Sequence, residues 1–220
     1  HGDLTIHRGV WGDNIRLSLA WSGWGKVSAA RAATRLLASD PGIDLLLFTG
    51  VAGAADPALR QWDVLLADAV VQHDMDARPL FPQFTLPALK QDRLQPQQGW
   101  FDWAQTALLE AYSAGELNGF ARPSSGLIAT GDRFIGDPTV LQTLRDALPG
   151  LRAVEMEGAA VAQVAEQEGV PWLVLRVISD GADEGAAQSF EDFIRRYEQQ
   201  AWRLIEALLK RCEGTPQQCE

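Results

Sequence analysis

The chain has 220 residues, of which 46% are hydrophobic and 22% are charged, and its formal net charge is −10 at pH 7. This length and composition predict one globular domain with a full hydrophobic core. The acidic balance argues against nucleic acid or an anionic membrane as a partner, and no apolar stretch approaches the roughly 20 residues that span a bilayer.

The N-terminal part predicts a hairpin followed by a helix. Residues 4–8 and 15–21 alternate between apolar and polar side chains, and the turn between them contains Gly12. Lys26 follows a glycine, but the earlier glycine and the following Ser or Thr of a phosphate-binding loop are missing, so we reject that interpretation. The helix that follows has one apolar face at helical spacing: Val27, Ala30, Ala33 and Leu37.

A buried strand over residues 43–48 runs into a segment with two glycines, residues 49–54. These glycines allow either a tight turn or the close approach of a ligand. Residues 63–71 predict another strand. Residues 78–98 are rich in proline and predict a long loop, and such loops in compact domains are usually functional or covered by a partner.

Two acids, His73 and a methionine gather in the sequence His73-Asp74-Met75-Asp76, which raises the question of a metal. No further pair of ligand residues accompanies them, so we expect no metal site. Cys212 and Cys219 lie near the end of the chain, where a disulfide would close only a short loop. We therefore expect reduced thiols and a cytoplasmic protein.

The C-terminal half alternates helices with strands. A helix around residues 103–111 precedes a strand over residues 126–129, and Asp137-Pro138 starts another helix. We expect one closing helix, capped by Ser189 and Asp192, with a single apolar stripe: Phe190, Phe193, Ile194, Tyr197, Ala201, Leu204, Ile205 and Leu208. The alternation predicts a single domain over residues 1–220, with a three-layer α/β/α fold around a central mixed, mostly parallel sheet.

The residues best suited to chemistry lie between these last elements. Glu155 and Glu157 precede a helix of small residues, and Ser179-Asp180 follow the apolar strand 172–178. Acids at the carboxyl ends of buried strands lie where open α/β sheets bind their ligands. One interpretation is a proton donor and an anion near a developing cation, and the alternative for each acid is helix capping.

Three separated segments carry a shared resemblance: residues 49–53, residues 130–135, and residues 154–158 together with 176–180. They resemble the nucleoside phosphorylase/nucleosidase superfamily, and most closely its methylthioadenosine/adenosylhomocysteine nucleosidase branch. The likeness covers residues 21–210. It implies the nucleoside phosphorylase-like fold, a homodimer, a small-molecule purine nucleoside as partner, and no metal or organic cofactor.

The resemblance also implies roles around the scissile bond. Asp180 matches the general acid that gives a proton to purine N7, and Ser179 orients its carboxyl. Glu157 matches the carboxylate that binds the ribose hydroxyls, and Met156 lies against the sugar. Arg176 falls near the position of the attacking water. The chemistry requires such groups, because the purine leaves as a neutral base only when a ring nitrogen is protonated.

The remaining implied contacts surround the base and the sugar. Phe134 stacks on the adenine, Ile135 reads its edge through backbone groups, and Gly53 is the glycine that allows close approach in the sugar pocket. For Phe134 and Met156, ordinary core packing is the alternative.

The activity that the resemblance implies is hydrolysis of the N-glycosidic bond of 5′-methylthioadenosine, S-adenosylhomocysteine or both, with release of adenine. The alternatives are a purine nucleoside phosphorylase, a futalosine hydrolase, and a nucleoside-binding module without turnover. Val51 replaces a hydroxyl residue that many relatives have, which argues against phosphate as acceptor. The family's first strand, with its water-activating glutamate, has no counterpart here. We therefore expect the chain as given to hydrolyse slowly or not at all, while still binding adenine-containing ligands.

Overall fold

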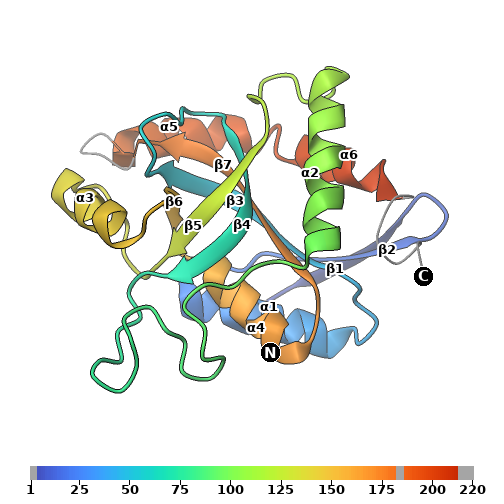
Figure 1. Ribbon diagram of the computed structural model, residues 1–220. Helices are drawn as coiled ribbons and strands as arrows, with labels where there is room; N and C mark the ends of the chain where they lie inside the picture. The colour runs from blue at the N-terminus through green and yellow to red at the C-terminus, as the bar shows by residue number, and fades with distance from the viewer. Residues whose placement is uncertain (1–3, 182–185, 213–220) are drawn as a thin grey trace.

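The computed structural model of the protein describes residues 4–181 and 186–212. In chain order its elements are β1 (Ile6–Trp11), β2 (Ile15–Ala20), α1 (Lys26–Ser39), β3 (Leu46–Ala54), β4 (Val64–Gln72), α2 (Gln98–Ser113), β5 (Ser124–Thr130), α3 (Pro138–Ala147), β6 (Leu151–Glu155), α4 (Gly158–Glu168), β7 (Trp172–Asp180), α5 (Ala186–Tyr197) and α6 (Trp202–Leu209). Figure 1 shows strands β3 to β7 at the centre with helices around them. Within the described residues, no helix is both long enough and apolar enough to cross a membrane.

Five strands form the central sheet, in the order β3-β6-β5-β4-β7, and the sheet closes on itself. The pairs β3–β7, β4–β5 and β5–β6 are parallel, whereas β3–β6 and β4–β7 are antiparallel. The mixed, mostly parallel sheet predicted from the sequence is therefore confirmed. Its closure through a short β3–β6 contact is an additional feature. Strands β1 and β2 form a separate antiparallel hairpin.

Helices cover both faces of the sheet, as the alternating side chains of β7 illustrate. Val174 and Ile178 pack in one core cluster with residues of α1 and α4. Leu173, Leu175 and Val177 pack in a second cluster with residues of α2, α5 and α6. Because successive side chains of a strand point to opposite faces, a strand buried on both faces reads as a continuous apolar run. The three-layer arrangement follows from these two clusters.

Two local predictions near the N-terminus were wrong. The glycine segment after residue 48 continues as strand, because its backbone pairs with β7 as far as Gly53 opposite Asp180. Glycine at position 50 leaves room for the Arg176 side chain, since a Cβ there would lie 3.2 Å from Arg176 Nη1. On α1, Ala33 and Leu37 of the predicted face are buried, whereas Val27 is 80% exposed. The rest of the buried face is formed by Ala29, Ala32 and Leu36.

The predicted single closing helix is two helices, α5 and α6. Tyr197 O accepts hydrogen bonds from the N–H groups of both Gln200 and Ala201, which forms a turn over residues 198–201. The apolar stripe continues through this turn, since Phe193, Tyr197, Leu204 and Leu208 are all buried. Ser189 lies inside α5 rather than before it, so the predicted capping box was also wrong.

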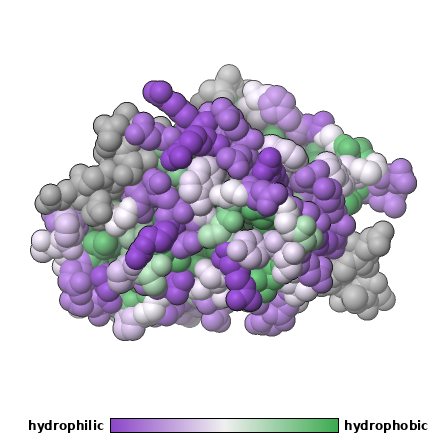
Figure 2. All heavy atoms as spheres, turned by 90° about the horizontal axis from the view of Figure 1, so that it is seen from above, coloured by the Kyte–Doolittle hydropathy of each residue, from purple (hydrophilic) through white to green (hydrophobic). Residues whose placement is uncertain are grey.

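Part of the molecular surface is shown in Figure 2. The face seen from above in Figure 2 is covered mostly by hydrophilic residues, with apolar side chains in separate small areas between them. Trp21 (80%) and Leu80 (84%) are among the most exposed large apolar residues of the described chain. The bulk of the apolar side chains is thus used in the core around the sheet.

Candidate active site

Glu155, at the end of β6, is the centre of a buried hydrogen-bond network. Its carboxylate accepts hydrogen bonds from the backbone N–H groups of Glu157 (3.0 Å) and Gly158 (2.8 Å), at the start of α4. The Thr130 hydroxyl donates another, and Arg176 Nη2 lies 2.6 Å from Glu155 Oε2. A carboxylate is stabilised at a helix N-terminus by the unpaired N–H groups and the helix dipole. Donors from β5, β7 and α4 therefore occupy both oxygens of Glu155.

Glu157 occupies the N-cap position of α4 and contacts the residue that precedes α1. The N–H group of Gly25 donates a 2.8 Å hydrogen bond to Glu157 Oε1. Burial raises the pKa of Glu157, and the negative charge of Glu155 raises it further. Glu157 is thus a partly desolvated carboxylate beside a glycine backbone, and it is more accessible than Glu155.

Asp180 is the last residue of β7 and is 5% exposed. Ser179 Oγ lies 2.7 Å from Asp180 Oδ2 and 3.2 Å from the carbonyl oxygen of Ala52. A hydroxyl group has one proton to donate, so it serves one of these two acceptors at a time. When that proton is directed to Ala52, a protonated Asp180 can donate its own proton to Ser179 Oγ. The geometry therefore accommodates Asp180 in its neutral, proton-carrying form.

The end of β3 connects these two acidic regions. Gly53 pairs with Asp180 on β7 and with Val154 on β6, one residue before Glu155. The register between β3 and β7 shifts at Ala52–Gly53, which marks a bulge at this point. Glu155 at the end of β6 and Asp180 at the end of β7 therefore lie on either side of the end of β3.

An exposed aromatic group lies beside these residues. Phe134, in the segment after β5, is 42% exposed, and its ring centroid is 6.2 Å from that of Phe190. The Trp24 ring lies 5.8 Å from Phe190, again edge to face. Ile135 is buried in the third core cluster, and Met156 is half-buried. An exposed aromatic face next to partly buried acids suits a flat, partly polar ligand.

The start of α1 is fixed to this region by a set of acids. Lys26 N–H donates to Asp132 Oδ1 (2.8 Å), and Lys26 Nζ lies 2.6 Å from Asp74 Oδ1. Asp132 N–H donates to Asp74 Oδ2 (2.9 Å). Burial by itself raises the pKa of Asp74, but the bonds from Lys26 and Asp132 outweigh it, so the pKa is lowered. The Lys26 ammonium group and the Asp74 carboxylate therefore form an ion pair.

The sequence did not single out Trp24, Gly25 or Thr130 as site residues. The sequence around Gly25 and Lys26 raises only a phosphate loop, which it then excludes, and it gives no signal for Trp24. Their contacts join parts of the chain far apart in sequence: Gly25 and Glu157 are 132 residues apart. No local pattern announces such a contact.

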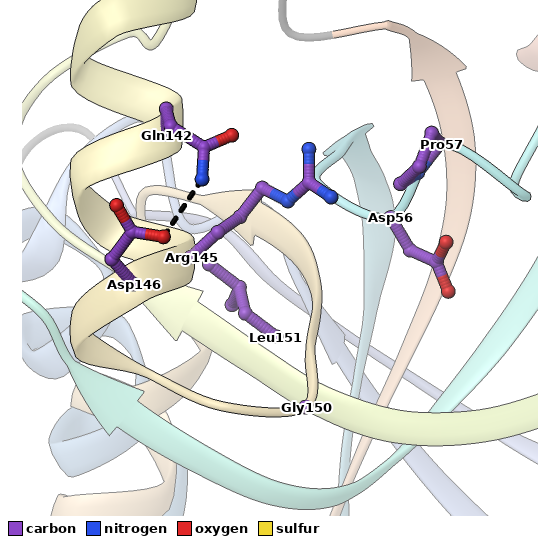
Figure 3. A pocket seen from close by; sticks show the side chains of 7 residues that line it. All are labelled: Asp56, Pro57, Gln142, Arg145, Asp146, Gly150 and Leu151. Atoms are coloured by element: carbon purple, nitrogen blue, oxygen red, sulfur yellow. Dashed lines mark hydrogen bonds between the residues drawn. The ribbon is translucent and has the colours of Figure 1, made fainter.

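A polar pocket of about 280 Å³ lies elsewhere on the surface, between α3 and the loop after β3. Figure 3 shows Arg145 extending from α3 toward Asp56 and Pro57, while Gln142 Nε2 donates to Asp146 Oδ1 (2.8 Å). None of the predicted site residues lines this pocket. We therefore take the region of Glu157, Asp180 and Phe134 as the candidate active site, since it contains the residues that the sequence assigns to the chemistry.

Comparison with known proteins shows which family the chain resembles. A family model described as the phosphorylase superfamily matches residues 1–210. The 5′-methylthioadenosine/S-adenosylhomocysteine nucleosidase of Geobacillus thermodenitrificans is 38% identical to the chain over 200 residues, which is 90% of this chain and 80% of that protein.

Solved structures give a similar result. A nucleosidase of the same name from Colwellia psychrerythraea, in complex with adenine, has a TM-score of 0.87 and 29% identity, covering 98% of this chain and 86% of that one. Futalosine hydrolase of Helicobacter pylori has a TM-score of 0.84 and 31% identity, covering 96% and 85%. Both likenesses extend over nearly all of the chain.

Proposed function

Because the chain belongs to the phosphorylase superfamily, we propose that it is a purine nucleosidase. It hydrolyses the N-glycosidic bond of 5′-methylthioadenosine, S-adenosylhomocysteine or both, and releases adenine. The observation that carries the proposal is Asp180, which is buried at the end of β7 with Ser179 Oγ 2.7 Å from its carboxylate. Proteins named as 5′-methylthioadenosine/S-adenosylhomocysteine nucleosidases match most of the chain, which supports the proposed function.

Asp180 is the general acid in this proposal. The glycosidic bond breaks through a state with positive charge on the sugar, and the purine leaves readily only when a ring nitrogen is protonated. An aspartic acid carries a proton near neutral pH only in a dry site, which the 5% exposure of Asp180 provides. Ser179 orients the carboxyl, and when its hydroxyl donates to Ala52 O it can accept a hydrogen bond from the neutral carboxyl of Asp180.

Glu157 binds the ribose hydroxyls, with Met156 against the sugar. The N–H group of Gly25 holds one oxygen of Glu157, which restricts the orientation of the carboxylate. A carboxylate below the ring both accepts hydrogen bonds from hydroxyls and stabilises the positive charge that develops on the sugar. Gly53 lies beside the sugar in this arrangement, since it pairs with Asp180 at the ends of β3 and β7.

Phe134 stacks on the adenine, and backbone groups of Ile135 read the edge of the base. The 42% exposure of Phe134 supports this assignment, because part of the ring is available to a flat base. Arg176 is near the attacking water in the proposal. Glu155 is a supporting residue rather than the base, since its oxygens are already occupied.

Futalosine is a second candidate substrate, because the Helicobacter pylori futalosine hydrolase is as similar in structure as the named nucleosidases are. The test incubates the protein with methylthioadenosine, adenosylhomocysteine and futalosine and measures free base by chromatography. Adding phosphate and looking for ribose 1-phosphate products separates hydrolysis from phosphorolysis. The proposal expects release of base from at least one of the three substrates, in contrast to the expectation from the sequence of slow or absent hydrolysis. Binding of adenine without release of base from any of them would overturn the proposal in favour of a binding module.

The proposal also includes a homodimer and a cytoplasmic location. Leu80, in the loop over residues 78–96, is 84% exposed. In a homodimer this leucine would pack against the second copy of the chain. The expectation of reduced thiols is the argument for this location. Cys212 is free, and Cys219 lies outside the described residues.

A further inference from the structure

A short turn before β4 holds the backbone that leads to Asp180. Gln61 Nε2 donates a 2.6 Å hydrogen bond to the carbonyl oxygen of Ser179. The N–H group of Trp62 donates a 3.0 Å bond to the carbonyl oxygen of Ile178. Two consecutive carbonyl groups just before the acid are therefore bound by two consecutive residues of one turn.

Trp62 has a backbone conformation that a bulky residue rarely adopts, with φ at 74°. Such conformations persist only where the surroundings enforce them, and they concentrate at functional sites. Here the indole ring lies 4.5 Å from the Phe193 ring and 5.7 Å from the Phe120 ring, measured between centroids. Arg196 Cζ lies 5.7 Å from the same indole. The side chain is thus held by α5 and by the segment after α2, and it holds the turn in place.

The turn acts where the regular sheet ends. The β4–β7 ladder stops at Val64 opposite Val177, so the bonds from Gln61 and Trp62 extend the support of β7 beyond it. On the other edge of β7, Gly53 pairs with Asp180. The end of β7 is consequently held from both sides, by β3 on one and by the turn on the other.

We propose that Gln61 and Trp62 are positioning residues for Asp180. They fix the peptide groups of Ile178 and Ser179, and through them the direction in which the Asp180 carboxyl presents its proton. This inference rests on the proposed function, in which Asp180 is the general acid. Small misplacements of a catalytic group reduce turnover strongly, even when the substrate still binds.

Gln61→Met tests the proposal, because it removes the amide donor but keeps the length of the side chain. We expect kcat for methylthioadenosine to fall about 10-fold with KM within about twofold, since the ground-state contacts are unchanged. Gln142→Met on α3 is the matched control and should leave both constants unchanged. An unchanged kcat in Gln61→Met would overturn the proposal.

A double-substitution cycle with Asp180→Asn separates positioning from general damage. If Gln61 acts through Asp180, Gln61→Met should lower turnover less than about twofold once the acid is absent. A loss of equal size in both backgrounds would overturn the proposal. Failure of the proposed function would give a different result: Asp180→Asn alone would leave adenine release near normal.

Trp62 gives an independent readout. Trp62→Phe keeps an aromatic ring on Phe193 and should retain most of kcat, whereas Trp62→Ala should lower kcat and shift the pH profile of kcat/KM. Trp62→Gly suits the positive φ but loses the ring, so its kcat should lie between those of Trp62→Phe and Trp62→Ala. Trp202→Ala, at an exposed tryptophan on α6, is the control. Equal pH profiles for the parent, Trp62→Phe and Trp62→Ala would contradict a role through Asp180.

Discussion

Arg176 Nη2 lies 2.6 Å from Glu155 Oε2, and the two side chains are only 1% and 2% exposed. The pair connects the middle of β7 to the end of β6, and the N–H group of Gly158 binds the same carboxylate. Burial removes both ions from water, so each charge depends on its partner. The pair therefore holds the start of α4, where Glu157 lies, against the strand that ends in Asp180.

Glu155→Gln is expected to destabilise the protein strongly. The substitution leaves the Arg176 guanidinium buried without its counter-ion, and breaking a buried pair in this way costs about 3–5 kcal/mol. The free energy of unfolding from urea titration measures the loss. Adding Arg176→Met to Glu155→Gln should recover part of it, because no unpaired charge then remains buried.

A surface ion pair provides the control for this prediction. Glu116 pairs with Arg211 at 3.0 Å on the exposed side of the molecule, and such pairs contribute little to stability. Glu116→Gln should therefore change the free energy of unfolding far less than Glu155→Gln. Equal effects of the two substitutions would show that the buried pair does not organise this region.

Asp180→Asn is expected to reduce turnover about 10²–10⁴-fold, the range typical for loss of a general acid. The amide keeps the shape of the side chain but has no acidic proton, so binding should change only modestly. Initial rates of adenine release give kcat and KM. Asp146→Asn on α3, at an exposed aspartate, is the control, and near-normal turnover of Asp180→Asn would refute the assignment.

We expect a homodimer with residues 78–96 near its interface. Leu80 in this loop is 84% exposed, and a second copy of the chain would bury it. Light scattering at micromolar concentration measures the mass, and Leu80→Asp should shift the population toward monomer. A monomeric parent protein under these conditions would contradict this prediction.

Elements with strong local signals were predictable from the sequence. The continuous apolar run of β7 indicated a strand buried on both faces, and Gly169 marked the end of α4, where it adopts φ of 68°. Asp137 was expected at the start of α3, and it caps the helix by accepting a bond from Thr139 N–H. In each case the residues that decide the structure are neighbours in the chain.

Features that depend on distant contacts were not predictable. The closure of the sheet rests on Gly53 opposite Val154, and the break between α5 and α6 interrupts an apolar stripe that is itself continuous. In the site, the positions of Glu155 and Glu157 after one strand did not distinguish them, and only the family resemblance assigned the ribose to Glu157. They differ because Arg176 binds the first and Gly25 binds the second.

Glu157 should make the stability of the protein depend on pH. Burial, and then the charge of Glu155, raise the pKa of Glu157 above the ordinary value of 4.5. Between the unfolded-state pKa and the raised folded-state pKa, the folded protein binds more protons. Stability therefore falls as the pH rises through this window, and the contribution is fully present only below the unfolded-state pKa. Glu157→Gln removes this dependence.

Glu157→Gln should therefore raise Tm relative to the parent at pH 7, with little difference near pH 4, where the glutamate is largely protonated. The same change should weaken ribose binding and turnover by about 1–3 kcal/mol, because a neutral amide replaces a charged acceptor. Glu168→Gln, at an exposed glutamate at the end of α4, is the matched control for both measurements. Rates with 2′-deoxy and 3′-deoxy substrates test the contact itself: the parent should discriminate against them more strongly than the variant does. Equal discrimination, with a Tm difference that is the same at both pH values, would show that Glu157 neither binds the ribose nor carries a buried charge.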